Sequence, residues 1–88
     1  MDERGWKIRE DLVYRKLVDG GMLYDSVEQR VHHLNATAAF VWEVCREEHQ
    51  TAEIVEALCA SFEVERERAR LDVEAILREF SSAELLQV

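Results

Sequence analysis

Three histidines and two cysteines are the side chains of this chain best suited to hold a metal ion or to act as nucleophiles. His32 and His33 are adjacent, and neighbouring side chains on a strand point to opposite faces, so the pair cannot easily bind one metal together. A zinc site would need His49, Cys45 or Cys59 beside one of them, and no spacing predicts that arrangement. The cysteines form no CxxC motif, so we interpret both as small buried apolar side chains, with a disulfide or redox role as the alternative. We expect no metal site.

Motifs of enzymatic chemistry are missing. The sequence contains no glycine-rich phosphate loop, no GxSxG and no HExxH. Nothing marks an acid–base pair among its 19 carboxylates. A core this small also leaves little room for a deep substrate pocket. We therefore expect a binding module with no catalytic residues and no cofactor, and not an enzyme.

Composition bounds the class of protein. The 88 residues suffice for one domain, 1–88, and the 48% hydrophobic and 34% charged content is typical of a globular protein. The formal net charge of −8 disfavours nucleic acid and anionic membranes as partners. Because the N-terminus is polar and no apolar run reaches the length of a membrane span, we expect a cytoplasmic location.

The first half of the chain favours strands. Short segments rich in β-branched and aromatic residues are predicted to be extended: 12–18, 22–25 and 30–34, with 6–8 as a further short piece. Residues 19–21 and 26–29 separate them as turns, and we expect Gly20 and Gly21 to supply the positive φ of the first turn. Connections this short predict an antiparallel meander.

The second half, residues 35–88, favours helices. Asn35 is expected to cap a helix over 36–47, and Thr51 a second one. A third helix is predicted from about residue 65 to 81, with its apolar stripe made of Ala69, Val73, Ile76, Leu77 and Phe80. The predicted fold class is therefore α+β: a winged-helix-like domain in which a small three-stranded antiparallel sheet precedes three helices.

Such a fold offers two binding surfaces. One is a helix presented to the DNA major groove, and the other is a free sheet edge that accepts an added peptide strand. The acidic charge and the mixed signs along the third helix disfavour DNA, because a DNA reader clusters Lys and Arg on its recognition helix. A winged-helix DNA-binding regulator and a structural, dimerising subunit stay open as alternatives.

The sequence from residue 19 to 43 resembles the PqqD family, the small peptide chaperones or RiPP recognition elements. The resemblance is carried by an ordered set of short motifs: His33-Leu34-Asn35, Thr37-Ala38-Ala39, Val41-Trp42, Thr51-Ala52-Glu53-Ile54-Val55 and Asp72-Val73-Glu74-Ala75. It spans roughly residues 12–80. Two departures are a longer loop at 46–50 without glycine, and Glu65-Arg66 where the family often has Asp-Pro.

This resemblance implies binding of a precursor's leader peptide as a strand beside the third strand, in a groove against the third helix, and delivery to a modifying enzyme. The implied peptide-binding residues are Arg30, Val31, His32, His33 and Leu34 on the edge strand, Ala69, Asp72, Val73 and Ile76 on the groove wall, and Arg68 and Leu71 as further neighbours. The histidine pair differs from the tryptophan version in lasso-peptide relatives, which favours a radical SAM enzyme as partner. A homodimer through the same free edge stays open.

Overall fold

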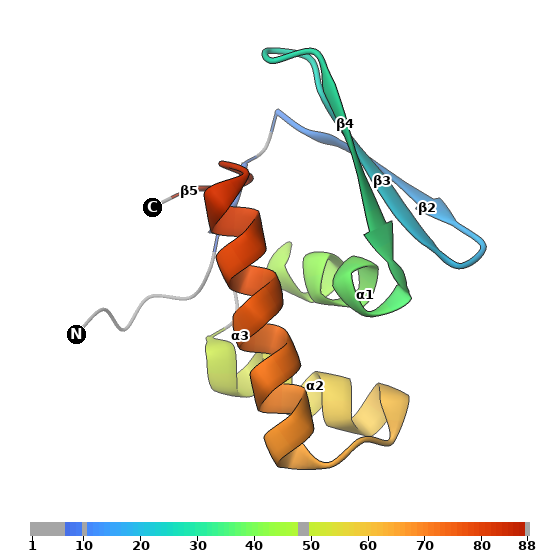
Figure 1. Cartoon of the computed structure of the whole chain (residues 1–88), viewed down its shortest axis with the longest axis vertical. Helices are drawn as coiled ribbons and strands as arrows, with labels where there is room; N and C mark the ends of the chain where they lie inside the picture. Colours follow the sequence, from blue (N-terminus) through green and yellow to red (C-terminus); the bar gives the residue numbers. More distant parts are fainter. Residues whose placement is uncertain (1–6, 10, 48–49, 88) are drawn as a thin grey trace.

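The computed structural model describes residues 7–9, 11–47 and 50–87, so Trp6 and His49 lie outside the described residues. Its elements in chain order are β1 (Lys7–Ile8), β2 (Val13–Leu17), β3 (Gly20–Asp25), β4 (Arg30–Asn35), α1 (Ala36–Cys45), α2 (Thr51–Phe62), α3 (Arg66–Ser82) and β5 (Leu86–Gln87) (Figure 1). A three-stranded antiparallel sheet followed by three helices confirms the expected α+β fold class.

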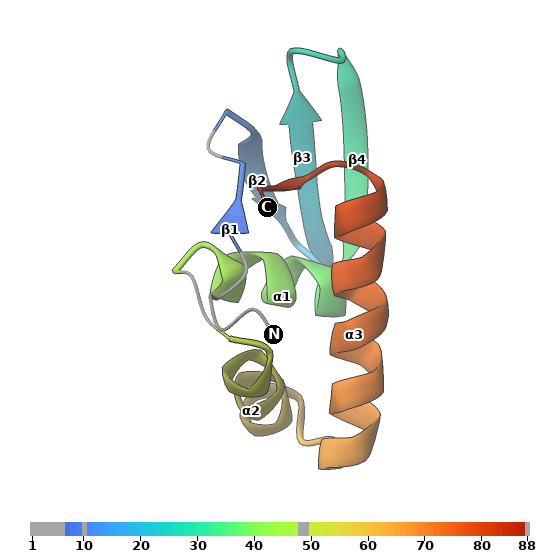
Figure 2. The same cartoon turned by 90° about the vertical axis from the view of Figure 1, so that its left-hand side faces the viewer.

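The sheet has the strand order β2-β3-β4, so β3 is central and both β2 and β4 are edges. Two views at right angles agree that β4 is the edge nearest to α3, and that β2 lies at the far side (Figures 1 and 2). Side chains alternate between faces along β3. Leu23 is fully buried towards the helices, whereas its neighbour Tyr24 is 41% exposed on the outer face.

The first turn differs from the expectation. It consists of Val18 and Asp19, and Gly20 and Gly21 already belong to β3, with no positive φ at either glycine. Their small size is needed for close packing instead. A Cβ on Gly20 would lie 2.1 Å from the carbonyl oxygen of Leu34, and one on Gly21 would lie 2.7 Å from the Tyr14 ring. The glycines therefore permit close approach within the sheet and do not bend the chain.

Replacing Gly20 with alanine is expected to lower the free energy of unfolding by about 1–3 kcal/mol, because the Leu34 backbone has to move to admit the methyl group. Denaturant titration measures the loss. Gly21→Ala is the matched control with a smaller expected loss, since the obstacle there is the end of the Tyr14 side chain. Equal stability of Gly20→Ala and the wild type would contradict the close approach of the Gly20 Cα to β4.

The predicted N-terminal cap is correct for α1 and is displaced by one residue for α2. Asn35 caps α1 as expected, and its Oδ1 accepts a hydrogen bond from the Ala38 N–H at 2.8 Å. The expected cap at Thr51 is wrong, because Gln50 is the cap of α2 and Thr51 its first helical residue. The Glu53 carboxylate accepts the Gln50 N–H at 3.0 Å, as in a capping box.

The end of the chain is a strand and not a continuation of the helices. β5 pairs antiparallel with β1, and Ile8 lies opposite Leu86. The expectation that residues 35–88 are helical is thus wrong for the last residues. Leu85 and Leu86 are buried and join the core, and this burial favours the extended ending over further helix.

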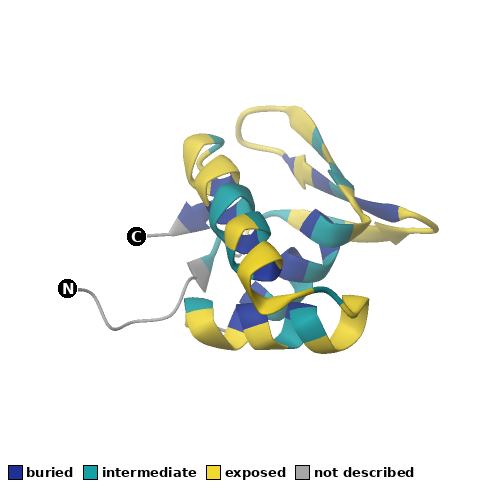
Figure 3. Cartoon of the chain, turned by 60° about the horizontal axis from the view of Figure 1, so that its bottom comes forward, coloured by how far each residue is buried: buried dark blue, intermediate teal, exposed yellow. Residues whose placement is uncertain are grey.

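The core lies between the sheet and the helices, with α1 in the middle (Figures 2 and 3). Trp42 is 1% exposed and meets Phe80 of α3 edge-to-face with ring centroids 5.5 Å apart, while Phe40 meets Phe62 of α2 in the same way at 5.4 Å. The two aromatic residues of α1 thus pack against different neighbours, as their spacing predicts. α3 contributes a buried stripe to the same core: Ala69, Val73, Leu77 and Phe80.

Both cysteines are free thiols. Cys45 is buried in the core, and this burial raises the pKa of its thiol to about 12, so the thiol stays protonated at neutral pH. Cys59 is partly buried against the same core. Cys45 therefore has the expected role of a small apolar side chain.

Candidate functional site

The outer edge of β4 is open. β4 pairs with β3 on one side, and within the described chain no strand pairs with its other side. α3 packs mainly against α2 and approaches β4 only marginally. The backbone of β4 is thus available to an additional strand.

The close approach at Gly20 shows which backbone groups of β4 face outward. The Leu34 carbonyl points at β3, since a Cβ added to Gly20 would lie 2.1 Å from its oxygen. Hydrogen-bonding direction alternates from residue to residue along an antiparallel strand. The N–H and C=O groups of Val31 and His33 therefore point away from β3 and towards the open edge.

Side chains of β4 divide between the two faces of the sheet. Val31 is 49% exposed on the outer face, where it lies opposite Tyr24. Tyr24 in turn lies opposite Val13, so these three residues form an exposed apolar row across the sheet. His32 and Leu34 are partly buried on the inner face. A peptide strand beside β4 would therefore meet an apolar row on one face and the protein core on the other.

His32 has an unsatisfied polar atom. Its Nε2 is buried without a hydrogen-bond partner, and among the described residues the Trp42 Nε1 is the other such side-chain atom. An unpaired buried donor or acceptor costs about 1–3 kcal/mol. His32 lies in the middle of β4, opposite Leu23. Its free nitrogen is thus a polar feature of the inner side of the open edge.

The expected wall residues on α3 occupy different environments. Ala69 and Val73 are fully buried, so their side chains belong to the core and are covered. Leu71 is 50% exposed and lies about 200° around the helix from Val73. Arg68 and Asp72 form an ion pair at 3.2 Å, in which Asp72 is the less exposed partner. Of the six expected residues, Asp72 and Ile76 are the partly buried ones, between core and surface.

Only part of α3 lies beside the sheet. The N-terminal half of the helix lies along α2, and its C-terminal half rises beside β4 (Figures 1 and 2). Ile76 belongs to the half beside β4, whereas Arg68 to Asp72 belong to the half that packs on α2. Glu79 follows Ile76 at a spacing of three, and therefore continues its helix face towards the C-terminus.

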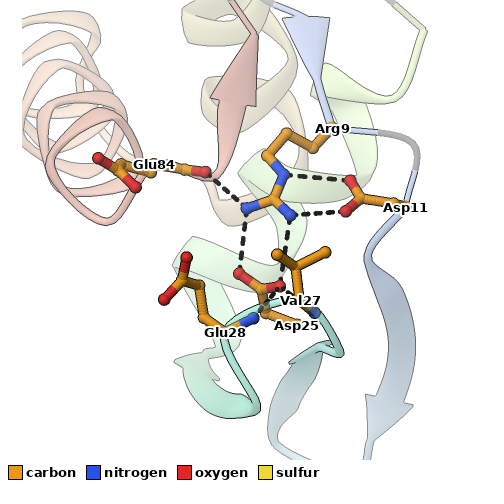
Figure 4. A network of polar contacts seen from close by, with 6 residues as sticks. All are labelled: Arg9, Asp11, Asp25, Val27, Glu28 and Glu84. Carbon is orange, nitrogen blue, oxygen red and sulfur yellow. Dashed lines mark hydrogen bonds and ion pairs between the residues drawn. The ribbon is translucent and has the colours of Figure 1, made fainter.

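The end of α3 is tied to the sheet by Arg9, which lies between β1 and β2. Its guanidinium donates to the carboxylates of Asp11 and Asp25 and to the backbone carbonyl of Glu84, just beyond α3 (Figure 4). Asp25 is 2% exposed and also accepts the N–H groups of Val27 and Glu28 in the β3–β4 turn. One arginine thus connects three segments that are distant in the sequence.

These contacts make stability pH-dependent. Hydrogen bonds from Arg9 hold the pKa of Asp25 and of Asp11 below their usual range. A depressed folded-state pKa stabilises the protein above the unfolded-state pKa of about 4, and this contribution is lost as the pH falls through the folded-state value. We expect the Tm advantage of the wild type over Asp25→Asn at neutral pH to shrink below about pH 4. A constant Tm difference between the two proteins from neutral pH to about pH 2 would contradict the assignment.

The arginines at the start of α3 are paired with carboxylates. Arg66 pairs with Glu56 of α2, and Arg70 pairs with both Glu67 and Glu74. With Arg68 paired to Asp72 as well, α3 presents a mixed-charge surface here. This surface lacks the basic cluster of a DNA-reading helix.

A hollow of about 200 Å³ lies away from the β4 edge. It lies between the β2–β3 turn, α1 and the end of α2, and its lining includes Leu17, Phe40 and Phe62. Among the residues that the structure describes, no group of histidine, cysteine and carboxylate side chains is arranged to hold a metal ion. Over the same residues, no helix has the length and apolar character needed to cross a membrane.

Comparison with known proteins identifies the family. The family model for Coenzyme PQQ synthesis protein D (PqqD) matches residues 20–86. The chain belongs to the PqqD family. The match confirms the resemblance seen in the sequence and extends it to β5. No curated protein matches the chain at a significant level.

Two solved structures share the fold of this PqqD family member. One is TbiB1 in complex with the TbiA(beta) leader peptide, with 28% sequence identity, 92% of this chain and 94% of that chain covered, and a TM-score of 0.82. The other is lasso peptide synthetase B1 complexed with the leader peptide, with 23% identity, coverage of 96% and 99%, and a TM-score of 0.82. The second likeness concerns the fold alone.

Proposed function

We propose that this protein binds the leader region of a ribosomally synthesised precursor peptide and presents it to a modifying enzyme. The observation that carries the proposal is the likeness to TbiB1, whose structure was solved with a leader peptide, over 92% of this chain. The open edge of β4 supplies the physical means, since an extended peptide can add to it as a fourth strand. The role is non-catalytic, and residues 1–88 act as one peptide-binding domain in the cytoplasm.

The leader strand would pair with the outward backbone groups of Val31 and His33. Its side chains would alternate between the two faces of the extended sheet. Those on the outer face would lie beside Val31 and continue the apolar row, and those on the inner face would lie near His32 and Ile76. An apolar residue at each of these points is the composition that the site favours.

Charged groups around the site provide selection between leaders. Arg30 is exposed at the start of β4, and Glu79 is exposed on the face of α3 that continues from Ile76. Arg68 and Asp72 pair with each other on the half of α3 that packs on α2, so they are not part of this charge pattern. A leader with charges complementary to Arg30 and Glu79 would bind faster and dissociate more slowly than one with the opposite pattern.

The modifying enzyme is proposed to be a radical SAM protein. This part of the proposal rests on the histidine pair of β4, His32-His33, in place of the tryptophan of lasso-peptide relatives. Pull-down of the enzymes encoded beside the gene, with and without the leader peptide, tests the pairing. Capture of a different enzyme class would redirect this part of the proposal and leave peptide binding unaffected.

An NMR titration tests the binding site. The purified protein is titrated with synthetic peptides that cover the leader of the precursor encoded beside its gene. Amide shifts concentrated at residues 30–34 and 75–83, with micromolar or tighter affinity, are the expected result. Shifts at residues 13–17 would move the site to the other edge of the sheet, and silence along β4 would reject the pairing. Self-association through β4 without peptide affinity would favour a dimerising subunit.

A further inference from the structure

We infer that Arg9 is a positioning residue that sets the spacing between β4 and the C-terminal half of α3, where the leader strand is proposed to add. The inference rests on the proposed function, because it concerns the same groove. It assigns a role in binding to a residue that lies on neither wall. The contacts of Arg9 carry the argument.

The first step is that Arg9 connects the residue that pairs with the start of β4 to the segment that follows α3. Its Nη1 donates to Asp25 Oδ2 and to the Glu84 carbonyl, both at 3.0 Å (Figure 4). Asp25 ends β3 and pairs with Arg30, the first residue of β4. Glu84 lies two residues beyond α3. A single nitrogen therefore bridges a residue paired with the start of β4 and a residue just beyond the end of α3.

The second step is that both bridged segments are held in a defined geometry. The Asp25 carboxylate organises the β3–β4 turn by accepting the Val27 and Glu28 N–H groups at 3.0 and 3.2 Å. On the other side, the Arg9 N–H donates to the Leu85 carbonyl at 3.1 Å, beside the Glu84 contact. Arg9 thus joins two ordered turns through its side chain and its backbone together.

The third step is that the β3–β4 turn has little apolar packing to hold it. The turn stands clear of the helices (Figure 1), and all its residues, 26–29, are exposed. At the opposite end of β4, the strand runs directly into α1. Chain continuity with α1 therefore fixes β4 at its Asn35 end, and the polar contacts of Arg9 tie its Arg30 end, through Asp25, to the segment after α3.

A fixed spacing increases affinity for the leader. If the start of β4 and the C-terminal end of α3 moved apart in the free protein, peptide binding would have to order them again. That entropy cost would weaken binding. We expect Asp25→Asn to weaken binding of the synthetic leader about 5- to 20-fold, an effect of the size typical for lost preorganisation. The asparagine Oδ1 can still accept both turn N–H groups, so the change acts mainly on the contact with Arg9.

The matched control is Asp11→Asn. Both substitutions remove one carboxylate that contacts Arg9, but Asp11 is half-exposed and lies only two residues away, so it connects no distant segments. Isothermal titration at a temperature where all variants are fully folded should give unchanged stoichiometry, weaker affinity for Asp25→Asn, and affinity within about twofold of wild type for Asp11→Asn. If the Arg9–Asp25 contact contributed only to global stability, Asp25→Asn would lower Tm and leave the leader affinity of the folded protein unchanged.

A double variant tests the connection itself. Arg9→Gln removes the bridge from the other side, and Arg9→Gln with Asp25→Asn together should bind no more weakly than Arg9→Gln alone, since both changes break one contact. Additive losses, or equal affinities of Asp25→Asn and Asp11→Asn, would overturn the inference. If the wild type itself binds no leader, the proposed function fails first, and the two failures are thereby distinguished.

Discussion

Proline in place of Val31 is expected to abolish leader binding while the sheet stays paired. The Val31 N–H points to the open edge and is not needed for pairing with β3, so the fold can accept its removal. A leader strand loses this donor, is left with an unpaired carbonyl and meets the proline ring. The combined cost is at least about 2 kcal/mol, or roughly 30-fold in affinity.

The opposite edge of the same sheet provides the control. Alternation from the two-residue β2–β3 turn places the Lys16 N–H on the outer side of β2, so Lys16→Pro removes an outward donor from the edge far from α3. Lys16→Pro should match Val31→Pro in stability and retain leader affinity. Val31→Thr, which keeps the N–H, should also bind. Isothermal titration and Tm together distinguish the outcomes, and unchanged affinity in Val31→Pro would reject strand addition at this register.

Loss of the Trp42 side chain is expected to have the largest effect on stability. Trp42 is almost fully buried at the centre of the core and packs edge-to-face on Phe80. Trp42→Ala should lower the free energy of unfolding by about 3–5 kcal/mol, because it removes a large apolar surface and leaves a cavity. Such a loss is comparable with the whole stability of many domains of this size, and denaturant titration measures it.

Trp42→Phe distinguishes the contribution of ring packing to stability from the cost of the unpaired Nε1 donor. The Trp42 Nε1 is buried without a partner, so phenylalanine removes an unsatisfied donor while it keeps most of the ring. The expected loss is below about 2 kcal/mol. A Trp42→Ala variant within about 1 kcal/mol of wild type would contradict the central place of this residue in the core.

The interactions that stabilise the fold differ from those proposed to bind the leader peptide. The core determines where α1 and α3 lie, and backbone hydrogen bonds along β4 are proposed to supply the affinity. Val31→Pro is therefore expected to change peptide binding, whereas Trp42→Ala is expected to change the free energy of unfolding. Both can be measured on the same purified chain.

The sequence alone determined the order and type of the main elements. Alternation and β-branched residues predicted the strands of the sheet, the spacing of apolar residues predicted the core stripe of α3, and the side chain of Asn35 marked the start of α1. These signals are local, because a strand, a helix face and a cap each depend on residues within a few positions. The family resemblance, carried by residues 19–43, is also a property of the sequence and is confirmed by the family match.

The tertiary structure decided the features that depend on distant residues. The local sequence predicts Gly20 and Gly21 as turn residues. Their small size is instead required by the Leu34 backbone and the Tyr14 ring, which the fold brings next to them. The strand at the C-terminus exists because Ile8, near the other end of the chain, pairs with Leu86. Neither partner is indicated by the local sequence.

The same reason explains the site. The edge strand at residues 30–34 could be predicted from the sequence, because a strand is one contiguous segment of the chain. It could not tell which half of α3 rises beside β4, since helix packing against α2 and the sheet decides that. Nor could it join Arg9 to Asp25 and Glu84, which are 16 and 75 residues away in the chain. Contacts between distant segments follow from the folded geometry, and only that geometry shows that one arginine connects Asp25, beside the start of β4, to Glu84, just beyond α3.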